Sequence, residues 1–313
     1  MRKGIKIAAA CLGVLVVAAV LVYYLFPGAV LGAATQMARW SAGVSRAEVQ
    51  VDDHRWVYLE GGKGEVVLFA HGFGESKDMW YNFPAAFAKR YRVVVPDLPG
   101  FGENSKHKEK NYGVPEQASR LERFTQAVGL TRFHLVGSSM GGAIACFYAS
   151  EHPEKVASLT LMDAFGVIAD KKSEALLLRE KDPTLTLAIR KPEDYDRIMQ
   201  IAYDRPPRMP AHFKRYLMPI FISQAEFNAK VFEDMWAGGL GILENRLARI
   251  TAPTLILWGK NDRMFDVSSA EKFKRGIRNS RVVILDAGHV VHNDQPEKAA
   301  EACLAFLKAP GVP

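Results

Sequence analysis

The chain has 313 residues, of which 49% are hydrophobic, 24% charged and 10% aromatic, and this composition excludes a disordered chain and fits one large domain with an appendage. Its three cysteines, at positions 11, 146 and 303, exclude a disulfide framework and match no zinc pattern, so the spacing predicts no metal site. The net charge of +7 includes Arg2, Lys3 and Lys6 and is otherwise spread along the chain, which gives no reason to expect nucleic acid as a partner.

An uncharged and almost wholly apolar run fills residues 7–26. At about 1.5 Å per residue it can cross a hydrocarbon core about 30 Å thick. A cleaved signal peptide is the alternative, but its apolar region usually has only about 7–15 residues, and no clean cleavage site follows. The sequence therefore predicts an uncleaved single-pass anchor. Because the basic residues precede the run, we expect the N-terminus in the cytoplasm and the rest of the chain on the far side, which is the periplasm for a bacterial inner membrane.

Residues 28–32 follow Pro27 with the pattern G-x-x-x-G. This pattern lets two transmembrane helices approach closely, and it would make the chain a homodimer through its anchor. The other interpretation, which we favour slightly, is a linker of small residues that leaves the membrane.

Strands and helices alternate from residue 46 onward. Short strands at 47–51 and 55–59 flank Asp52 and Asp53, which predicts a hairpin. A helix is predicted over 115–128, with a proline at its start and a glycine just past its end. Six apolar runs are typical of buried parallel strands, and they cover 66–70, 93–95, 133–136, 159–162, 254–258 and 282–285. The alternation predicts an α/β fold with a doubly wound, mostly parallel sheet.

The stretch 167–250 interrupts this alternation. It is helical in pattern and rich in proline, which predicts a helical cap inserted over the carboxyl edge of the sheet. We therefore divide the chain into an anchor and juxtamembrane segment (1–38), a first part of the core (39–166), the cap (167–250) and a second part of the core (251–313). Within the cap, residues 205–222 carry arginine and lysine among apolar residues and no acidic residue. Either this segment touches a membrane surface, or its apolar side chains line a pocket from inside.

The strand at 133–136 leads into Gly137-Ser138-Ser139-Met140-Gly141, and a helical run follows. G-x-S-x-G between a strand and a helix is typical of a nucleophile elbow, in which a strained turn exposes the serine hydroxyl. Side chains at the two outer glycines would collide with neighbouring backbone. Met140 would begin the helix and offer its N–H to an oxyanion. The alternative is a structural glycine-rich turn.

Three further pieces complete a hydrolytic site. His71-Gly72-Phe73-Gly74 follows a strand and predicts the Phe73 N–H as a second oxyanion donor, although an ordinary turn would look the same. Asp262 and His289 each follow a late strand, so that the order is Ser, Asp, His. His289 would take the proton of Ser139 and return it to the leaving group, and Asp262 would hold the imidazole tautomer. Asp163 is the alternative acid, and we favour Asp262.

These residues belong to five longer motifs: HGFGESKDMW (71–80), DLPGFG (97–102), HLVGSSMGG (134–142), WGKNDRMFDVS (258–268) and GH (288–289). With them the chain resembles the α/β-hydrolase superfamily over about residues 47–308. More narrowly, it resembles bacterial family V-type membrane-associated lipases and phospholipases and the anchored monoacylglycerol lipases of animals. The resemblance implies an α/β-hydrolase fold with a helical cap, esterase or lipase activity on acylglycerol or phospholipid, and neither a metal nor an organic cofactor.

We therefore predict a membrane-anchored serine hydrolase of lipid acyl esters, with a lipid substrate and the bilayer as its partners. Its substrate contacts are expected from His71, Gly72, Ser138, Phe165, Phe213 and Phe221. One alternative is a carbon–carbon bond hydrolase with the same triad, whose members are soluble. The other is a membrane-tethered binding protein on a hydrolase fold, which a missing triad residue would have favoured.

Other polar and sulfur-containing residues are expected to have structural roles. Cys146 and Cys303 fall inside helical runs and are predicted to be small core residues. Asp97 is expected to brace a turn, and Asp266 to begin a helix. His292 is expected to have no catalytic role and to lie at the surface or against the cap.

Overall fold

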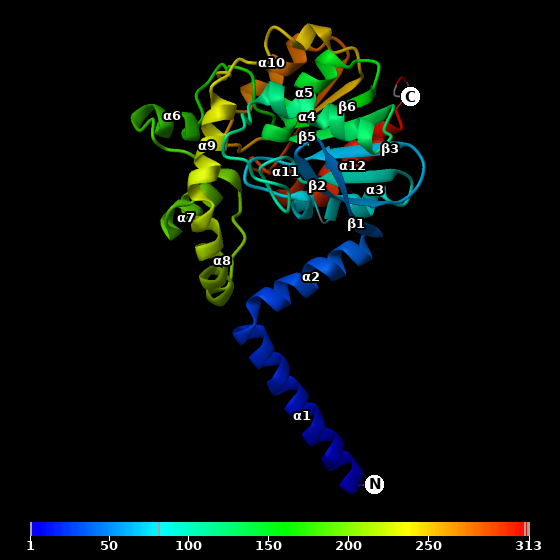
Figure 1. Ribbon diagram of the computed structural model, residues 1–313, viewed down its shortest axis with the longest axis vertical. Coiled ribbons are helices and arrows are strands. Elements are labelled where there is room, and N and C mark those ends of the chain that lie inside the picture. The colour runs from blue at the N-terminus through cyan, green and yellow to red at the C-terminus, as the bar shows by residue number, and fades with distance from the viewer. Residues whose placement is uncertain (1, 81, 310, 312–313) are drawn as a thin grey trace.

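The computed structural model describes residues 2–80, 82–309 and 311, and an eight-stranded sheet lies at its centre (Figure 1). The spatial order is β1-β2-β4-β3-β5-β6-β7-β8, in which β1 and β2 are antiparallel and β3 to β8 are parallel. The strands are β1 (Val44–Val51), β2 (His54–Gly61), β3 (Val66–Ala70), β4 (Arg92–Pro96), β5 (Phe133–Ser138), β6 (Val156–Met162), β7 (Thr254–Gly259) and β8 (Ser280–Leu285). Every predicted strand is present, and the predicted sheet is confirmed.

Helices cover both faces of the sheet, and its central strands β5, β6 and β7 are therefore buried at every position. In β3, Leu68 packs into the core beneath one set of helices, while Val67 and Phe69 point to the opposite face. The first face carries α4 (Val114–Ala127), α5 (Met140–Glu151) and α10 (Ser268–Gly276). The second carries the 3₁₀ turn η1 (Lys77–Trp80), α3 (Asn82–Phe87), α11 (Val291–Asp294) and α12 (Pro296–Leu307). Cys146 and Cys303 are buried, one on each face, as the sequence predicts.

The stretch predicted as the cap folds into helices that stand to one side of the sheet (Figure 1). They are α6 (Glu174–Lys181), α7 (Pro192–Ala202), α8 (Ala211–Ser223) and α9 (Ala225–Trp236), and the 3₁₀ turn η2 (Leu247–Arg249) leads back to the core. α9 belongs to the core beside α4 and α5 through Phe227, Val231 and Phe232. The cap segment therefore packs on the same face as the helix that follows Ser139.

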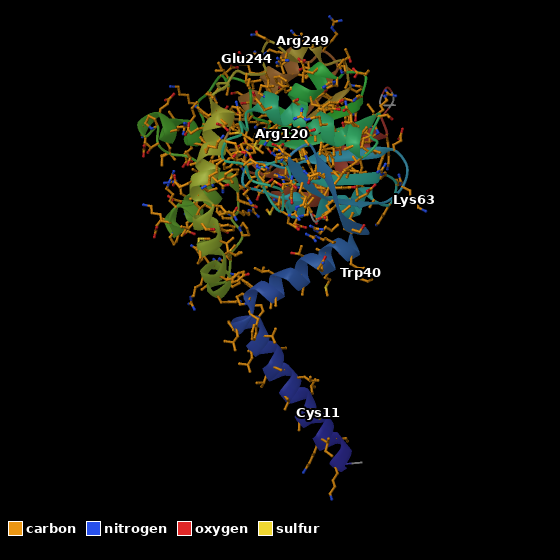
Figure 2. All side chains as sticks on the ribbon, viewed as in Figure 1. Cys11, Trp40, Lys63, Arg120, Glu244 and Arg249 are labelled. Atoms are coloured by element: carbon orange, nitrogen blue, oxygen red, sulfur yellow. The ribbon has the colours of Figure 1, made fainter. Side chains whose placement is uncertain are left out.

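The N-terminus forms two helices, α1 (Arg2–Leu25) and α2 (Pro27–Ser41). Within α1, the segment Lys3–Leu25 is long and apolar enough to cross a membrane, with a mean hydropathy of 2.7 and none of its most apolar stretch buried. Cys11 on α1 and Trp40 on α2 point away from the rest of the protein (Figure 2). The chain bends sharply between the two helices (Figure 1), where Pro27 occupies the first turn of α2.

The G-x-x-x-G pattern lies in α2, outside the apolar helix. Residues 28–32 are helical and follow the candidate span, so the linker of small residues is part of a helix, and the dimer interpretation stays a prediction. A Cβ atom added at Gly28 would lie 2.4 Å from the hydroxyl of Tyr216 on α8, whereas one at Gly32 would meet nothing within 4 Å. Gly28 is thus small because α8 packs against it, a contact within the chain.

The cap also meets the end of α1. The ring of Tyr23 lies 4.6 Å from that of His212 and 5.4 Å from that of Phe213, and Tyr24 lies 4.8 Å from His212 (centroid distances). These aromatic contacts tie the start of α8 to the junction of α1 and α2. They also hold Phe213 away from the place expected for it, against the substrate.

Candidate active site

Ser139 lies at a strained turn between β5 and α5. Its φ of +53° and ψ of −116° are backbone angles that residues other than glycine rarely adopt. The turn needs glycine on both sides of Ser139, because the backbone leaves no room for a side chain there. A Cβ at Gly137 would lie 2.3 Å from the Gly141 oxygen, and one at Gly141 would lie 2.2 Å from the Ala70 oxygen. These are the collisions expected from the sequence, and they make the segment a nucleophile elbow in geometry.

The structure brings Ser139, His289 and Asp262 together. His289 Nε2 lies 2.8 Å from Ser139 Oγ, and His289 Nδ1 lies 2.9 Å from Asp262 Oδ2. The other carboxylate oxygen of Asp262 accepts the N–H groups of Met264 and Phe265, at 2.7 and 3.0 Å. His289 and Asp262 are buried, so this chain of hydrogen bonds is shielded from water.

Asp163 lies beside the triad but does not contact His289. It follows β6 with a φ of +45°, and its carboxyl accepts the Gly259 N–H at 2.7 Å and the Val291 N–H at 3.4 Å. Burial raises the pKa of the Asp163 carboxyl, and the neighbouring carboxylate of Asp262 raises this pKa further. Asp163 therefore braces the ends of the two loops that carry Asp262 and His289.

Ligand atoms of Asp163, Asp262 and His289 lie within 4.8 Å of one another, which is close enough to hold a metal ion. The donor set does not suit one, because both nitrogens of His289 are hydrogen-bonded to Ser139 and Asp262. Asp163 is likewise engaged by backbone N–H groups.

Two backbone N–H groups are available beside Ser139. Met140 is the first residue of α5, where an N–H has no partner within the helix. Phe73 N donates no hydrogen bond to any residue that the structure describes. The loop is held close, because a Cβ at Gly72 would lie 3.4 Å from Ser139 Cβ, and the Gly72 N–H donates to Glu75 Oε2 at 2.8 Å. Burial raises the pKa of Glu75.

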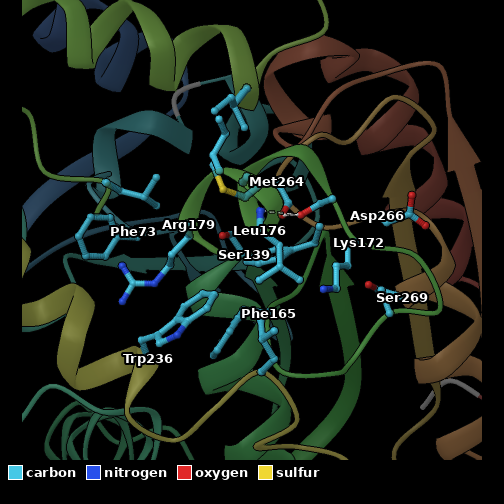
Figure 3. Close-up of a pocket in the computed structure, with 18 of the residues that line it drawn as sticks. Phe73, Ser139, Phe165, Lys172, Leu176, Arg179, Trp236, Met264, Asp266 and Ser269 are labelled. Atoms are coloured by element: carbon cyan, nitrogen blue, oxygen red, sulfur yellow. Dashed lines mark hydrogen bonds between the residues drawn. The ribbon is translucent and has the colours of Figure 1, made fainter. Parts of the chain in front are cut away.

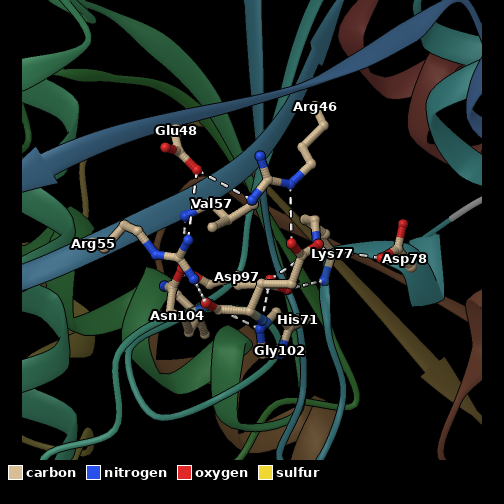
Figure 4. A network of polar contacts seen from close by, with 12 residues as sticks. Arg46, Glu48, Arg55, Val57, His71, Lys77, Asp78, Asp97, Gly102 and Asn104 are labelled. Carbon is tan, nitrogen blue, oxygen red and sulfur yellow. Dashed lines mark hydrogen bonds and ion pairs between the residues drawn. The ribbon is translucent and has the colours of Figure 1, made fainter.

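The loop of Gly72 and Phe73 rests on a buried polar network (Figure 4). His71 Nε2 accepts the Leu98 N–H at 2.9 Å while Nδ1 donates to the Gly72 oxygen at 2.8 Å, and burial lowers the pKa of His71. Next to Leu98, Asp97 accepts the backbone N–H and the Nζ of Lys77, at 2.7 and 3.0 Å. Burial alone would lower the pKa of Lys77, but the surrounding carboxylates hold it above its usual value. Asp97 thus braces a turn, as expected, whereas His71 supports the loop from behind.

An apolar pocket of about 430 Å³ opens above Ser139 (Figure 3). The core contributes Phe73, Met140, Phe165 and Phe265, and the cap segment contributes the opposite wall, with Leu176, Ile198, Ile201, Phe232, Met235 and Trp236. Arg179 lies across this wall, with its guanidinium 4.9 Å from the Phe232 ring centre and 4.8 Å from that of Trp236, and it pairs with Glu233 at 3.0 Å. Its charge is therefore compensated.

Of the six residues expected to touch substrate, only Phe165 lines this pocket. His71 and Ser138 are fully buried behind it, and Gly72 is turned to Glu75. Phe221 packs on Tyr195, with 6.1 Å between ring centres, and Phe213 lies against α1. The expectation that α8 lines the pocket is therefore wrong. The pocket wall comes instead from α6, α7 and α9, whose apolar residues carry no distinguishing motif.

The α/β-hydrolase fold family matches residues 65–296. The chain belongs to this family. It is 32% identical to lipase 1 of Psychrobacter immobilis, with 80% of each chain covered, and 30% identical to monoacylglycerol lipase abhd6-A of Xenopus laevis, with 97% of this chain and 94% of the relative covered. Among solved structures, it is similar to a membrane phospholipase A described as a bacterial virulence factor, with a TM-score of 0.85, 40% identity and coverage of 96% and 97%. The resemblance found in the sequence is thereby confirmed.

In this α/β-hydrolase the loop of His289 is held by the cap. The His289 N–H donates to the Ala202 oxygen at the end of α7, at 2.8 Å. One oxygen of Asp294 accepts the N–H groups of both Gly288 and Asp204, at 2.7 and 2.9 Å. The role of Asp294 was not visible in the sequence, because its two partners are 6 and 90 residues away.

His292 is not at the surface, and the expectation that it contacts solvent or the cap is wrong. Only 2% of it is exposed, and its ring stacks on Trp80 with 4.3 Å between centroids. Neither ring nitrogen has a hydrogen-bond partner among the described residues, and burial lowers the pKa of His292 to about 3. The neutral ring behaves as an aromatic core side chain under the loop of His289.

Proposed function

We propose that this chain is a membrane-anchored serine hydrolase that cleaves lipid acyl esters through an acyl-enzyme. The observation that carries the proposal is His289, which bridges Ser139 and Asp262 at 2.8 and 2.9 Å on the floor of an apolar pocket. General hydrolysis of lipid esters agrees with the similarity to named lipases and to a phospholipase A. The roles of individual residues and the orientation in the membrane are our proposals.

In the first half of the reaction, His289 Nε2 takes the proton of Ser139 as Oγ attacks the ester carbonyl carbon. The oxygen that becomes negative lies at the N–H groups of Phe73 and Met140, and such donors stabilise the transition state more than the substrate. The carbon–oxygen bond to the alcohol then breaks, and the alcohol leaves with the proton held by His289. Asp262 keeps the proton of Nδ1 in place and stabilises the imidazolium.

In the second half, His289 takes a proton from water, which attacks the acyl carbon on Ser139. The fatty acid leaves, and the proton returns to Oγ. In this proposal the protons move only between water, His289 and Ser139. The apolar walls of the pocket suit the hydrocarbon of the acyl chain, because its transfer from water is favourable in proportion to the apolar area buried.

The anchor would hold this pocket at the bilayer. The candidate span ends at Leu25, and near this end Tyr23 and Tyr24 are aromatic residues of the kind that lie at membrane interfaces. Their contact with His212 ties α8 to that level. We propose a cytoplasmic N-terminus and a hydrolase domain on the far side, with the cap spanning 167–250. Within the segment 205–222, Lys214 pairs with Asp196 at 2.5 Å and Arg205 with Asp204 at 3.8 Å. The exposed cations proposed to meet anionic headgroups are therefore Arg208 and Arg215.

A homodimer through residues 28–32 is not part of the proposal. Gly28 is covered by Tyr216 of the same chain, so the pattern has an explanation within one molecule.

The test compares the full chain with a variant that lacks residues 2–25, on a short soluble ester and on monoacylglycerol or phospholipid in vesicles. We expect equal rates on the soluble ester and a sharp loss on vesicles, with Ser139→Ala as the inactive control. If the shortened chain clears vesicle lipid as fast as the full chain, the anchor does not serve access to substrate. If a carbon–carbon substrate is cleaved and no ester is, the chain is a carbon–carbon hydrolase and our proposal is wrong. If Ser139 does not react with a fluorophosphonate, the chain is a binding protein and our proposal is also wrong.

A further inference from the structure

A second cavity, of about 340 Å³, lies between α2 and the core. Its walls come from one side of α2, the first residues of β1, and parts of β2, η1 and α3. None of its lining residues lines the pocket above Ser139. Figure 1 shows that α2 runs from the end of α1, near α8, to the foot of β1.

The cavity exists because α2 presents small side chains to the core. Leu31, Ala34 and Ala38 recur at spacings of three and four residues, which places them on one face of the helix, and Ala42 lies directly after its end. The alanine side chains do not reach the opposite wall, which is also apolar and includes Leu59. Protein interiors are normally packed without such voids, and an apolar cavity of roughly 150 Å³ is already large enough to bind benzene. An apolar ligand is therefore the chemistry that this space fits.

The cavity contains no uncompensated charge among its lining residues. Arg39 and Asp78 are its two charged groups, and they form a two-pronged pair in which Arg39 Nε and one Nη donate to the two carboxylate oxygens at 2.8 and 2.7 Å. Of their side chains, 12% and 28% are exposed, so the pair is held in place. An anion or a cation would find no free partner here, whereas hydrocarbon meets apolar walls.

The cavity opens toward the level of the membrane and closes toward the sheet. Leu31 lies four residues after Pro27, about 6 Å along α2 from the start of that helix, which follows the candidate span. Ala34 is exposed, whereas Ala42 is only 5% exposed. On the outer side of α2, Trp40 is 82% exposed, and an exposed tryptophan is typical of a helix that lies at a membrane interface.

We propose that this cavity binds one acyl chain of a bilayer lipid, which enters beside Ala34 and packs between α2 and the core. The occupant is a membrane component, separate from the lipid that is hydrolysed at Ser139. It would fix the hydrolase domain against the bilayer by filling the space that the alanines leave. The inference rests on the proposed membrane anchoring and not on the proposed hydrolysis.

The test uses the full chain with Ser139→Ala, so that the probe is not hydrolysed, reconstituted into vesicles of phosphatidylcholine that carries a diazirine on one acyl chain. After photolysis, mass spectrometry locates the labelled residues. We expect label on Val44, Leu59 or Pro84, which line the cavity from the core side, as well as on α1. Ala38→Phe should fill the cavity and lower the label at these core residues at least tenfold, while label on α1 persists.

Ala33→Phe is the matched control, because Ala33 is exposed on α2 and does not line the cavity. It should leave the label unchanged. Ala34→Leu is a second variant that fills the cavity less. To show that each α2 variant folds, it is also made in the chain that keeps Ser139, where it must hydrolyse a short soluble ester at the normal rate.

Label on α1 without label on the core residues would overturn the inference and leave the anchoring intact. Equal label in Ala38→Phe and Ala33→Phe would also overturn it. A disulfide between two chains of Ala34→Cys would show that another copy occupies the cavity, and it would overturn the inference. Absence of label from α1 itself would overturn the anchoring and this inference together.

Discussion

Asp262→Asn is expected to slow hydrolysis far more than Asp163→Asn, although both carboxyls lie beside the same histidine loop. Oδ1 of Asp262 accepts two backbone N–H groups, from Met264 and Phe265. In the asparagine variant the amide oxygen must stay there, since turning the amide would place its NH₂ against both donors and cost about 1 kcal/mol for each lost hydrogen bond. The NH₂ group therefore faces His289 Nδ1, and the imidazole proton moves to Nε2. With this proton in place, Nε2 can no longer accept the proton of Ser139.

The magnitudes follow from this geometry. In a serine protease the corresponding change of tautomer costs about 10⁴-fold in kcat, which at about 1.36 kcal/mol per factor of ten is about 5.4 kcal/mol. Burial raises the pKa of Asp163, so the neutral amide of asparagine, which is close to the carboxyl in shape, removes a charge that burial disfavours. The Gly259 N–H keeps its acceptor, and the contact at risk is the long one to Val291 at 3.4 Å. Losing this hydrogen bond should raise the activation free energy by about 1 kcal/mol, which lowers kcat by less than a factor of ten.

The assay is kcat/KM on a short soluble ester, with thermal unfolding of each variant to show that the fold is intact. The rate at which a fluorophosphonate labels Ser139 should fall in the same order, because it also needs the activated hydroxyl. Equal losses in the two variants, or a larger loss for Asp163→Asn, would refute the assignment of Asp262 as the partner of His289.

Three further results are expected. Ser139→Ala should lower kcat by about 10⁶-fold with an unchanged unfolding temperature, and a residual rate within tenfold of the wild type would exclude Ser139 as the nucleophile. His292→Phe should stabilise the protein increasingly as the pH falls from about 6.5 toward 3. In this range the unfolded His292 binds a proton, whereas the folded one, with its pKa of about 3, does not. Unfolding temperatures of the variant and the wild type that differ by the same amount at every pH would contradict this. Gly28→Leu should push Tyr216 aside and make the cap more sensitive to protease, whereas Gly32→Leu should not; equal digestion would show that α2 and α8 do not depend on Gly28.

The features that the sequence predicts well are those set by neighbouring residues. The elbow at Ser139 follows from two glycines within two positions of it, and the sheet follows from runs of apolar residues that are buried on both faces. The same local pattern favoured Asp262 over Asp163 but could not place either carboxyl against His289. That choice depends on which carboxyl reaches His289 across the sheet, and the structure gives 2.9 Å for Asp262.

The features that the sequence did not predict depend on contacts between distant segments. Phe213 has the apolar character of a pocket residue, but it packs on Tyr23 because α8 meets the end of α1. His292 is polar and lies next to a loop, yet it is buried because Trp80 offers a stacking surface. The helix at residues 28–32 was missed for the same reason. Glycine weakens a helix, but Gly28 is needed there because Tyr216 leaves no room for a side chain.

The most direct test of the account measures lipid hydrolysis and labelling of Ser139 in one sample. The full chain in vesicles is titrated with a fluorophosphonate, the fatty acid released is counted, and the labelled peptide is identified by mass spectrometry. The account predicts one label per chain on Ser139 and a loss of lipid hydrolysis in proportion to it, with protection by added monoacylglycerol. Hydrolysis of vesicle lipid that persists after Ser139 is fully labelled would contradict the account.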